Sequence, residues 1–558
     1  MLVGIDVGGT FTDGLVFADG KVTCWEKRPT NTSWLRESIE AVLDGLLPGR
    51  NGKDVERIVL STTLVTNLLA TGQLEKAALV IIPGPGLNPY DMPLLDDYYV
   101  CQGGIDFRGR EIVKVNPAEV YEIGQTINRQ GIRKVAVVGK FCQRNPMQEE
   151  QVAAILKKNF PHMDVLMGHQ VSGELNFPRR AITTYYTLTT RDQWSQFAGE
   201  IEAVLRSRNI TVPVEVMKAD GGTMSLAASR QAPCETVFSG PAASTMGAYA
   251  LTMDDMTSVV VDIGGTTTDL AFILQGKPLH ASRGAKIGHR YTHIKALAVR
   301  SVALGGDSAV RLSGDRLLIG PDRQGNAACF GGPAPTPTDA FNLLGGGQLG
   351  NLELSYQSLA SLGGGDAKTV NSLAEKVVQV FIDLLQQNIQ DMMLSWEQEP
   401  AYKVWEIVNR RRVKLERVIG IGAASPAVIP LLASRIGCRG FVNRLSTVGN
   451  ALGAVVARPT LQLSLHADTQ TGTYSTGDDL KKLNHPGRIQ IHDIKKLAER
   501  ELLALAEAKG MTEYFAEREF TLEEQFNVVR GWSTSGRIFD VGITISPGVI
   551  KGFKGVKA

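Results

Sequence analysis

The sequence predicts an α/β protein made of two related domains and a smaller C-terminal region. Three observations lead to this prediction. Apolar segments typical of strands alternate along the chain with segments that have the 3.6-residue apolar spacing of helices. The motif D-x-G-G-T-x-T-D occurs at residues 6–13 and again at residues 262–269. The length of 558 residues is too great for a single hydrophobic core.

On these grounds we divide the chain into three parts. Residues 1–200 and 201–462 are expected to form the two related α/β domains, each containing one copy of the motif. Residues 463–558 are expected to form a small α/β appendage, in which we identify no catalytic side chains.

Composition and charge exclude several classes of protein. The hydrophobic content of 43% and the charged content of 21% are those of an ordinary globular protein, and the net charge of +2 indicates neither nucleic-acid nor anionic-membrane binding. No apolar run reaches membrane-spanning length, and Asp6 and Asp13 interrupt the apolar start, unlike in a signal peptide. The six cysteines have no C-x-x-C spacing, which argues against a zinc site and suits a reducing compartment. We therefore expect a cytoplasmic protein.

Each copy of the motif is predicted to form the tip of a strand–turn–strand hairpin, because apolar segments flank it on both sides. Glycines without a Cβ let backbone N–H groups approach a phosphate, and threonine hydroxyls add donors. Asp6 and Asp262, at the ends of buried strands, are suited to hold a hard divalent cation. An ordinary Gly-rich hairpin would explain one copy, but two copies favour a nucleotide phosphate clamp.

The motif supplies the first candidate site residues. We expect Asp6, Asp262 and Asp269 to be catalytic, and Asp6 and Asp262 to bind Mg²⁺ or Mn²⁺. The residues expected to contact the nucleotide are Gly8, Gly9, Thr10, Thr12, Asp13, Gly264, Gly265, Thr266, Thr267 and Thr268.

The first half of the chain continues with alternating elements. After the first hairpin we expect a strand at 21–27, a helix at 33–47, a strand at 55–60 with a polar turn opening into a helix over 61–70, strands at 77–82 and 135–141, and a helix at 146–157. A strand near 214–224 then leads to a small-residue helix ending near 251.

The second half contains three further elements of note. The apolar spacing predicts a long amphipathic helix over 370–394. A strand from 415 runs into Gly420, Gly422 and Ala423 and then a helix, and such a turn is either a tight strand–helix connection or a place where a ligand approaches the backbone. Small residues at 449–457 predict a closely packed helix. In the appendage we expect a loop at 467–480, a helix at 494–508 and an exposed edge strand at 537–545.

Taken in order, these motifs resemble the hydantoinase A/oxoprolinase family. That family belongs to the actin-like ATPase superfamily, together with sugar kinases and heat-shock chaperones. The resemblance covers roughly residues 1–460 and is much more specific than any single motif. It is carried by the duplicated motif and by Thr62-Thr63 to Asn67, Asn145-Pro146, Asp220-Gly221-Gly222, Ser239-Gly240-Pro241-Ala242, Gly305-Gly306-Asp307-Ser308, Gly331-Gly332 and Thr336-Pro337-Thr338-Asp339-Ala340.

The resemblance implies duplicated actin-like, ribonuclease H-like ATPase domains that flank a cleft for ATP and Mg²⁺ or Mn²⁺. It implies that Gly305 and Gly306 contact the nucleotide, that Gly420, Gly422 and Ala423 pack against adenine and ribose, and that 449–457 is a hinge helix. Relatives commonly carry Asp-x-His where this sequence has Ala298 and Arg300. Relatives also commonly work beside a hydantoinase B-type subunit, so we expect an oligomer.

The function implied is that of an ATP-dependent hydrolase or carboxylase subunit, acting on cyclic amides or similar small molecules by phosphorylating an amide, lactam or carbonyl oxygen. The alternatives are an ATP-driven activator or conformational protein and a small-molecule kinase. The absence of a cluster-binding cysteine pair weakens the activator alternative. Because the sequence offers no Ser-His, Cys-His or paired-histidine arrangement for a second chemical step, we expect the chain to act with a partner.

Overall fold

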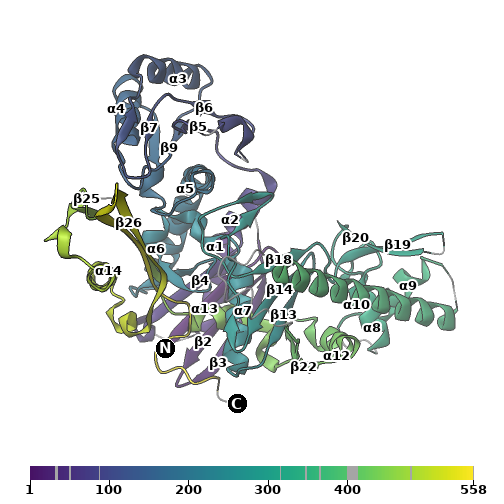
Figure 1. Ribbon diagram of the computed structural model, residues 1–558. Coiled ribbons are helices and arrows are strands. Elements are labelled where there is room, and N and C mark those ends of the chain that lie inside the picture. The colour runs from purple at the N-terminus through teal and green to yellow at the C-terminus, as the bar shows by residue number, and fades with distance from the viewer. Residues whose placement is uncertain are drawn as a thin grey trace.

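Two sheets, an inserted domain and a C-terminal sheet make up the molecule, and Figure 1 shows their arrangement. Strands and helices alternate along the chain, which confirms the predicted α/β class. The computed structural model describes residues 1–31, 35–48, 52–86, 88–92, 94–314, 316–345, 349–363, 366–398, 413–477 and 480–556.

The first sheet has six strands in the order β12-β11-β4-β1-β2-β3. Strands β1 and β2 form hairpin 1 (residues 2–18), in which Asp6 lies opposite Asp13, and β4 runs parallel to β1. The strands β11 and β12 belong to this sheet, although both lie beyond residue 200. The strand bounds are Leu2–Val7 (β1), Phe11–Ala18 (β2), Lys21–Pro29 (β3), Arg57–Thr62 (β4), Val214–Met217 (β11) and Thr223–Ser225 (β12).

The second sheet repeats this arrangement. Strands β13 and β14 form hairpin 2 (residues 258–274), in which Asp262 lies opposite Asp269, and β21 runs parallel to β13 as β4 does to β1. The duplication predicted from the motif is therefore confirmed in both strand order and register. The strand bounds are Ser258–Ile263 (β13), Thr268–Leu274 (β14), Lys277–Pro278 (β15), Val299–Val302 (β18), Arg417–Ile421 (β21) and Arg439–Phe441 (β22).

Helices α7 (Ser239–Thr252) and α13 (Gly449–Val456) pack against each other and against strands of both sheets. A Cβ on Gly453 would lie 1.8 Å from the carbonyl oxygen of Ala243, and a Cβ on Gly247 would lie 2.0 Å from that of Gly449. Only glycine permits helix backbones to approach so closely. The two predicted small-residue helices are thus confirmed, and their contact joins the two halves of the molecule.

The inserted domain, residues 77–170, interrupts the first sheet between β4 and β11. Its four parallel strands lie in the order β10-β9-β5-β6. Its main elements are β5 (Ala77–Ile82), β6 (Tyr99–Val100), β7 (Gly104–Ile105), β8 (Glu111–Val113), α3 (Pro117–Arg129), β9 (Lys134–Gly139), α4 (Met147–Asn159) and β10 (Asp164–Met167).

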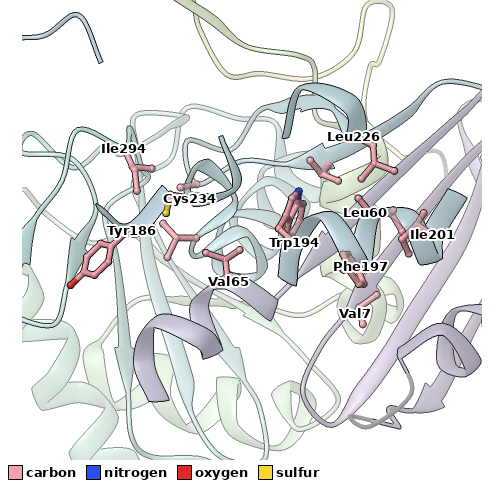
Figure 2. Packing of buried hydrophobic residues seen from close by; sticks show 14 of the residues in the cluster. Val7, Leu60, Val65, Tyr186, Trp194, Phe197, Ile201, Leu226, Cys234 and Ile294 are labelled. Atoms are coloured by element: carbon pink, nitrogen blue, oxygen red, sulfur yellow. The ribbon is translucent and has the colours of Figure 1, made fainter. Parts of the chain in front are cut away.

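The long helix α5 (Phe177–Ser207) lies between the inserted domain and the first sheet. Figure 2 shows its Trp194, Phe197 and Ile201 in one cluster with Val7 and Leu60 from strands of the first sheet. The sequence patterns did not predict this helix, because it is buried on several sides and its apolar residues do not form one stripe.

Of the seven further helices given below, five were predicted, and the two at Pro337–Leu344 and Leu352–Ala360 were not. The predicted helix at 33–47 is α1, of which residues 33–34 lie outside the described part of the chain, and the long amphipathic helix is α10. The bounds are Leu35–Leu46 (α1), Leu64–Thr71 (α2), Pro337–Leu344 (α8), Leu352–Ala360 (α9), Ala367–Glu397 (α10), Ser425–Ile436 (α12) and Ile491–Ala508 (α14). Short strands Lys286–Ile287 (β16), Arg290–Tyr291 (β17), Ser308–Ser313 (β19) and Arg316–Arg323 (β20) form two further hairpins.

The C-terminal sheet, residues 461–545, corrects two predictions. Residues 467–480 are not a loop throughout, because Thr473–Ser475 form β24, which pairs with β23 (Leu461–Asp468). The predicted edge strand is β27 (Ser533–Ile545), but it lies between β23 and β26 (Arg518–Arg530). Its alternating Phe539, Val541 and Ile543 are buried, a pattern that suits a central strand equally well.

This sheet docks on the inserted domain, as Figure 1 shows. Arg108 of the inserted domain forms an ion pair of 2.6 Å with Asp468, and Arg144 forms one of 3.0 Å with Asp540. In the described part of the chain no helix is both long and apolar enough to cross a membrane.

Candidate nucleotide-phosphate site

The two copies of the motif meet at one side chain, that of Asn450. Nδ2 of Asn450, in α13, donates to Oδ2 of Asp6 and to Oδ2 of Asp262, at 3.3 Å in both cases. The carboxylates of the two hairpins therefore face each other across a single amide, although they lie 256 positions apart in the sequence (262 − 6). The sequence predicted the two carboxylates and missed Asn450, which lies in a run of small residues and belongs to no recognisable motif.

The carboxylates are held close together in a poorly hydrated environment. Burial, with the nearby charges of Asp13 and Asp262, raises the pKa of Asp6 to about 7. Burial also raises the pKa of Asp262 and, together with the charge of Asp262, raises the pKa of Asp269 to about 7. A divalent cation placed between such groups would stabilise their ionised forms.

The second aspartate of each copy has a different cross-strand neighbour. Asp13 lies opposite Lys27 of β3, whose Nζ is 2.7 Å from both carboxylate oxygens. Asp269 occupies the same place in hairpin 2 but lies opposite Ser301 of β18. Asp13 is therefore neutralised by a lysine, whereas Asp269 has only a hydroxyl on the neighbouring strand.

The hairpin tips supply free backbone donors. The amides of Gly8 and Gly264 close the turns, donating to the carbonyls of Phe11 and Thr267 at 3.1 and 2.9 Å. The next amide in each copy, that of Gly9 and Gly265, donates to no acceptor among the described residues. Together with the exposed or half-exposed threonines Thr10, Thr266 and Thr267, these amides form the part of each tip that is open to a phosphate.

Two threonines predicted to contact phosphate are instead structural. Thr12 is fully buried, and its hydroxyl lies 2.9 Å from that of Thr30. Thr268 is also fully buried, and its hydroxyl donates to the carbonyl of Leu304 at 2.7 Å. Thr268 is the first residue of β14, and Thr12 is the second residue of β2. Because side chains alternate between the two faces of a strand, these two point into the fold and not to the tip.

The loop of Gly305 and Gly306 packs on the tip of hairpin 2. The amide of Gly306 donates to the carbonyl of Gly264 at 2.9 Å, and the amide of Asp307 donates to that of Gly265 at 2.8 Å. A Cβ on Gly265 would lie 2.5 Å from Oδ2 of Asp307. Asp307 in turn pairs with Arg323 of β20 at 2.9 Å, so an ion pair borders this tip.

The strand–helix turn after β21 borders the same site. Gly422 has a φ of +90°, and a Cβ there would meet the carbonyl oxygen of Ile263 at 2.6 Å and Oδ1 of Asp262 at 3.3 Å. Ala423, next in the turn, is exposed. Gly420 does not share this position, because a Cβ there would meet Ile429 of α12 at 2.4 Å, so the helix packing requires that glycine.

The arrangement fits a magnesium–nucleotide complex. Oδ1 of Asp6 is buried without a hydrogen-bond partner, which leaves an acceptor available to a cation. Nowhere in the described residues do three or more His, Cys, Asp or Glu side chains form a metal site on their own. A pair of carboxylates is nevertheless the usual protein contribution to Mg²⁺ binding, since phosphate oxygens and water complete its shell.

The remaining positions of interest lie outside this group. Ala298 and Arg300, where the resemblance led us to expect Asp-x-His, lie on or beside β18. The amide of Ala298 donates to the carbonyl of Leu279 at 2.7 Å, and Arg300 pairs across strands with Leu270. One Ser–His contact that the sequence did not predict joins Ser172 Oγ and His293 Nδ1 at 2.7 Å. Both residues lie at the boundary with the inserted domain, where the backbone amide of His293 donates to Thr183 Oγ1 of α5.

Two family models match the chain. The model described as hydantoinase/oxoprolinase matches residues 180–462, and the model of the hydantoinase/oxoprolinase N-terminal region matches residues 2–160. Caprolactamase subunit alpha of Pseudomonas jessenii is 23% identical over 78% of this chain and 67% of its own length. Acetophenone carboxylase gamma subunit of Aromatoleum aromaticum is 24% identical over 68% of this chain and 57% of its own length.

Solved structures agree with the fold. One is the nucleotide-free structure of acetone carboxylase, an enzyme of ATP-dependent acetone carboxylation. It has a TM-score of 0.72 at 17% identity, and the match covers 99% of this chain and 88% of the acetone carboxylase chain. The structure of the ATP-dependent caprolactamase of P. jessenii has a TM-score of 0.71 at 18% identity. That match covers 98% of this chain and 87% of the caprolactamase chain. The chain spans between 19% and 67% of the length of the curated relatives that it matches.

Proposed function

The chain belongs to the hydantoinase/oxoprolinase family, and from this premise we propose that it binds MgATP between hairpins 1 and 2 and phosphorylates an amide, lactam or carbonyl oxygen of a small substrate. The single observation that carries the proposal is the meeting of Asp6 and Asp262 at the Asn450 amide. It supports one shared cation site with a phosphate-binding tip on either side.

The nucleotide has a natural direction in this arrangement. The turn at Gly422 and Ala423 lies on the hairpin 2 side, where Gly422 packs against Ile263 and Asp262, and the small, exposed side chain of Ala423 leaves room for adenosine beside it. The phosphates would then extend past hairpin 2 toward hairpin 1. Asp6 and Asp262 would hold the cation, whose chemistry is to neutralise the charge of the phosphates during transfer.

In the first step of the proposed reaction, the terminal phosphoryl group of ATP is transferred to the substrate oxygen. The substrate loses a proton from its amide nitrogen or its α-carbon, and its oxygen forms a bond to the γ-phosphorus. The bond between that phosphorus and the β–γ bridging oxygen breaks, and ADP leaves. Asp269 is suited to accept the proton, because its pKa of about 7 lies near neutral pH and Ser301 opposite it carries no competing charge.

Phosphorylation makes the carbonyl oxygen a good leaving group, and a second step, hydrolysis or carboxylation, would follow. We propose that this step takes place with a hydantoinase B-type subunit. Two relatives are themselves subunits, caprolactamase alpha and acetophenone carboxylase gamma. Two ion pairs, of Asp468 with Arg108 and of Asp540 with Arg144, join the C-terminal sheet to the inserted domain. This position supports a partner, and not this sheet, as the cover of the nucleotide site.

The test is a screen of small amides, lactams and ketones for stimulated ADP formation, with and without a hydantoinase B-type subunit. Tight nucleotide binding by the isolated chain and substrate turnover only after mixing would support the proposal. Complete turnover by the isolated chain would reject the partner, and a stable phosphorylated product without further reaction would identify a kinase. No binding of MgATP under any condition would reject the proposed function.

A further inference from the structure

Lys27 of β3 lies beside Asp13 of hairpin 1. Its Nζ lies 2.7 Å from both oxygens of Asp13 and 3.4 Å from the carbonyl of Thr447, and 5.1 Å from the centre of the Phe11 ring. Thr447 belongs to the turn that leads into α13 and Asn450. The ammonium group therefore lies where hairpin 1 meets the segment that joins the two halves of the molecule.

Lys27 also stands alone among acidic neighbours. Four aspartates gather here, Asp6, Asp13, Asp262 and Asp269, and Lys27 is the one lysine or arginine in the described chain within 4.0 Å of any of their carboxylates. A cation so placed would compensate negative charge brought in by a ligand as well as that of Asp13.

The duplication shows that this cation is specific to one half. The position on β18 that corresponds to Lys27 by cross-strand pairing is Ser301. Both hairpins offer glycine amides and an aspartate for Mg²⁺, so these shared parts do not distinguish them. The lysine is what hairpin 1 adds, and a lysine is a compact point charge on a flexible stem, suited to a phosphate.

We propose that Lys27 binds the terminal phosphate of ATP, so that hairpin 1 holds the phosphoryl group to be transferred while hairpin 2 and Gly422 hold the rest of the nucleotide. This inference rests on the proposed function and deepens it. The ammonium has three protons, so it can keep one contact with Asp13 and turn another toward the phosphate. Asp13 is then a positioning residue, which holds Lys27 at the site in the absence of ATP.

The test compares a non-hydrolysable ATP analogue, adenylyl imidodiphosphate, with ADP, each with Mg²⁺, by titration calorimetry. In Lys27→Met we expect the dissociation constant of the analogue to rise about 10- to 100-fold, the cost of losing one charge-assisted hydrogen bond. For ADP, which lacks the terminal phosphate, we expect at most about a threefold change. Lys21→Met is the matched control, since it removes an exposed lysine from the same strand.

A second variant separates a direct contact from the effect of leaving Asp13 without its partner. Asp13→Asn/Lys27→Met removes both charges, so the buried carboxylate is no longer left unpaired. If Lys27 contacts the phosphate, the double variant also binds the analogue weakly. Recovery of wild-type affinity in the double variant would overturn the proposal, because Lys27 would then act only by pairing with Asp13.

Two other results would contradict the inference while leaving the proposed function intact. One is unchanged affinity for both nucleotides in a folded Lys27→Met protein. The other is an equal loss for the analogue and for ADP, which would assign Lys27 to the inner phosphates. Failure of the wild-type chain to bind either nucleotide would overturn the proposed function and this inference together.

Discussion

Hairpins 1 and 2 have the same register but different surroundings. In each, the first aspartate of the motif lies opposite the second, and a parallel strand runs beside it. Beside hairpin 1 this strand ends in Ser61 and Thr62, and beside hairpin 2 it ends in Ile421 before Gly422. Duplication thus gives the site two equivalent frames, and the neighbouring strands place different residues beside them.

The difference also concerns crowding and charge. The tip of hairpin 2 is bordered by the Gly305–Gly306 loop and by the ion pair of Asp307 and Arg323. A Cβ on Gly9, at the tip of hairpin 1, would meet nothing within 4 Å, and Lys27 lies beside the return strand. An open tip with a lysine beside it suits a group that must react, and a closely bordered tip suits a group that must be held.

The largest effect is expected from Asp262, the hairpin 2 carboxylate that faces Asp6 across the Asn450 amide. Asp262→Asn should reduce Mg²⁺-dependent ATP hydrolysis by at least about 1,000-fold, because the loss of charge at a cation site impairs catalysis far more than it impairs packing. Steady-state kinetics would measure the loss, and circular dichroism would check the fold. The matched control is Asp255→Asn, an exposed carboxylate in the loop before β13. Normal turnover by a folded Asp262→Asn protein would remove hairpin 2 from the site.

The second prediction tests whether hairpin 2 holds the nucleoside. Gly422→Val should weaken ATP binding about 10- to 100-fold, since a Cβ at this position would clash with the carbonyl oxygen of Ile263 at 2.6 Å and push the turn away from Asp262. The control is Gly437→Val at the other end of α12, which has a similar φ of +81° but faces open space. Calorimetry that returns the same affinity for Gly422→Val and wild type would show that the turn is only structural.

The smallest expected effect concerns the aspartates that differ in their partners. The pKa of Asp269 is raised from 3.8 to about 7, so the folded state binds this proton more tightly than the unfolded state. Stability contributed by the protonated form is therefore present below pH 3.8 and is lost as pH rises through about 7. Asp269→Asn should reduce this loss in the metal-free protein.

Thermal unfolding at several pH values would measure the effect, and it should amount to a few kcal/mol at most. Asp13→Asn is the variant with which Asp269→Asn is compared. Because Lys27 pairs with Asp13, this substitution would leave the lysine without its carboxylate partner. A pH dependence in Asp269→Asn as steep as in wild type would show that Asp269 is not protonated in the folded protein. In kinetic measurements, the activity of the wild-type protein should rise with pH through about 7, and this rise should be absent in Asp269→Asn.

The hairpins could be predicted from the sequence because their features are local. Glycines, β-branched residues and aspartates at fixed spacing determine a turn, and a second copy of the motif removes most of the ambiguity. The long helix α10 has a clear apolar stripe and could equally be predicted from the sequence. What these cases share is that each residue's role depends on neighbours a few positions away.

The rest depended on partners distant in the chain. Asn450 is one polar residue in an apolar helix, and its role exists only because two strands end beside it. Lys27 looked like an ordinary strand residue until pairing brought it opposite Asp13. Thr12 and Thr268 match the motif but point into the fold, and β27 is an interior strand because β26 pairs with its outer side. Such facts follow from tertiary pairing, which single-sequence patterns do not encode.

The central claim is that the two hairpins form one cation–phosphate site, and a double-mutant cycle tests it most directly. Calorimetry would give the gain in ATP affinity that Mg²⁺ provides in wild type, Asp6→Asn, Asp262→Asn and the double variant. If both carboxylates hold one ion, either single substitution should remove nearly all of that gain and the second should add little. Independent, additive losses in the two single variants would contradict the account, because they would mean that the hairpins act as separate sites.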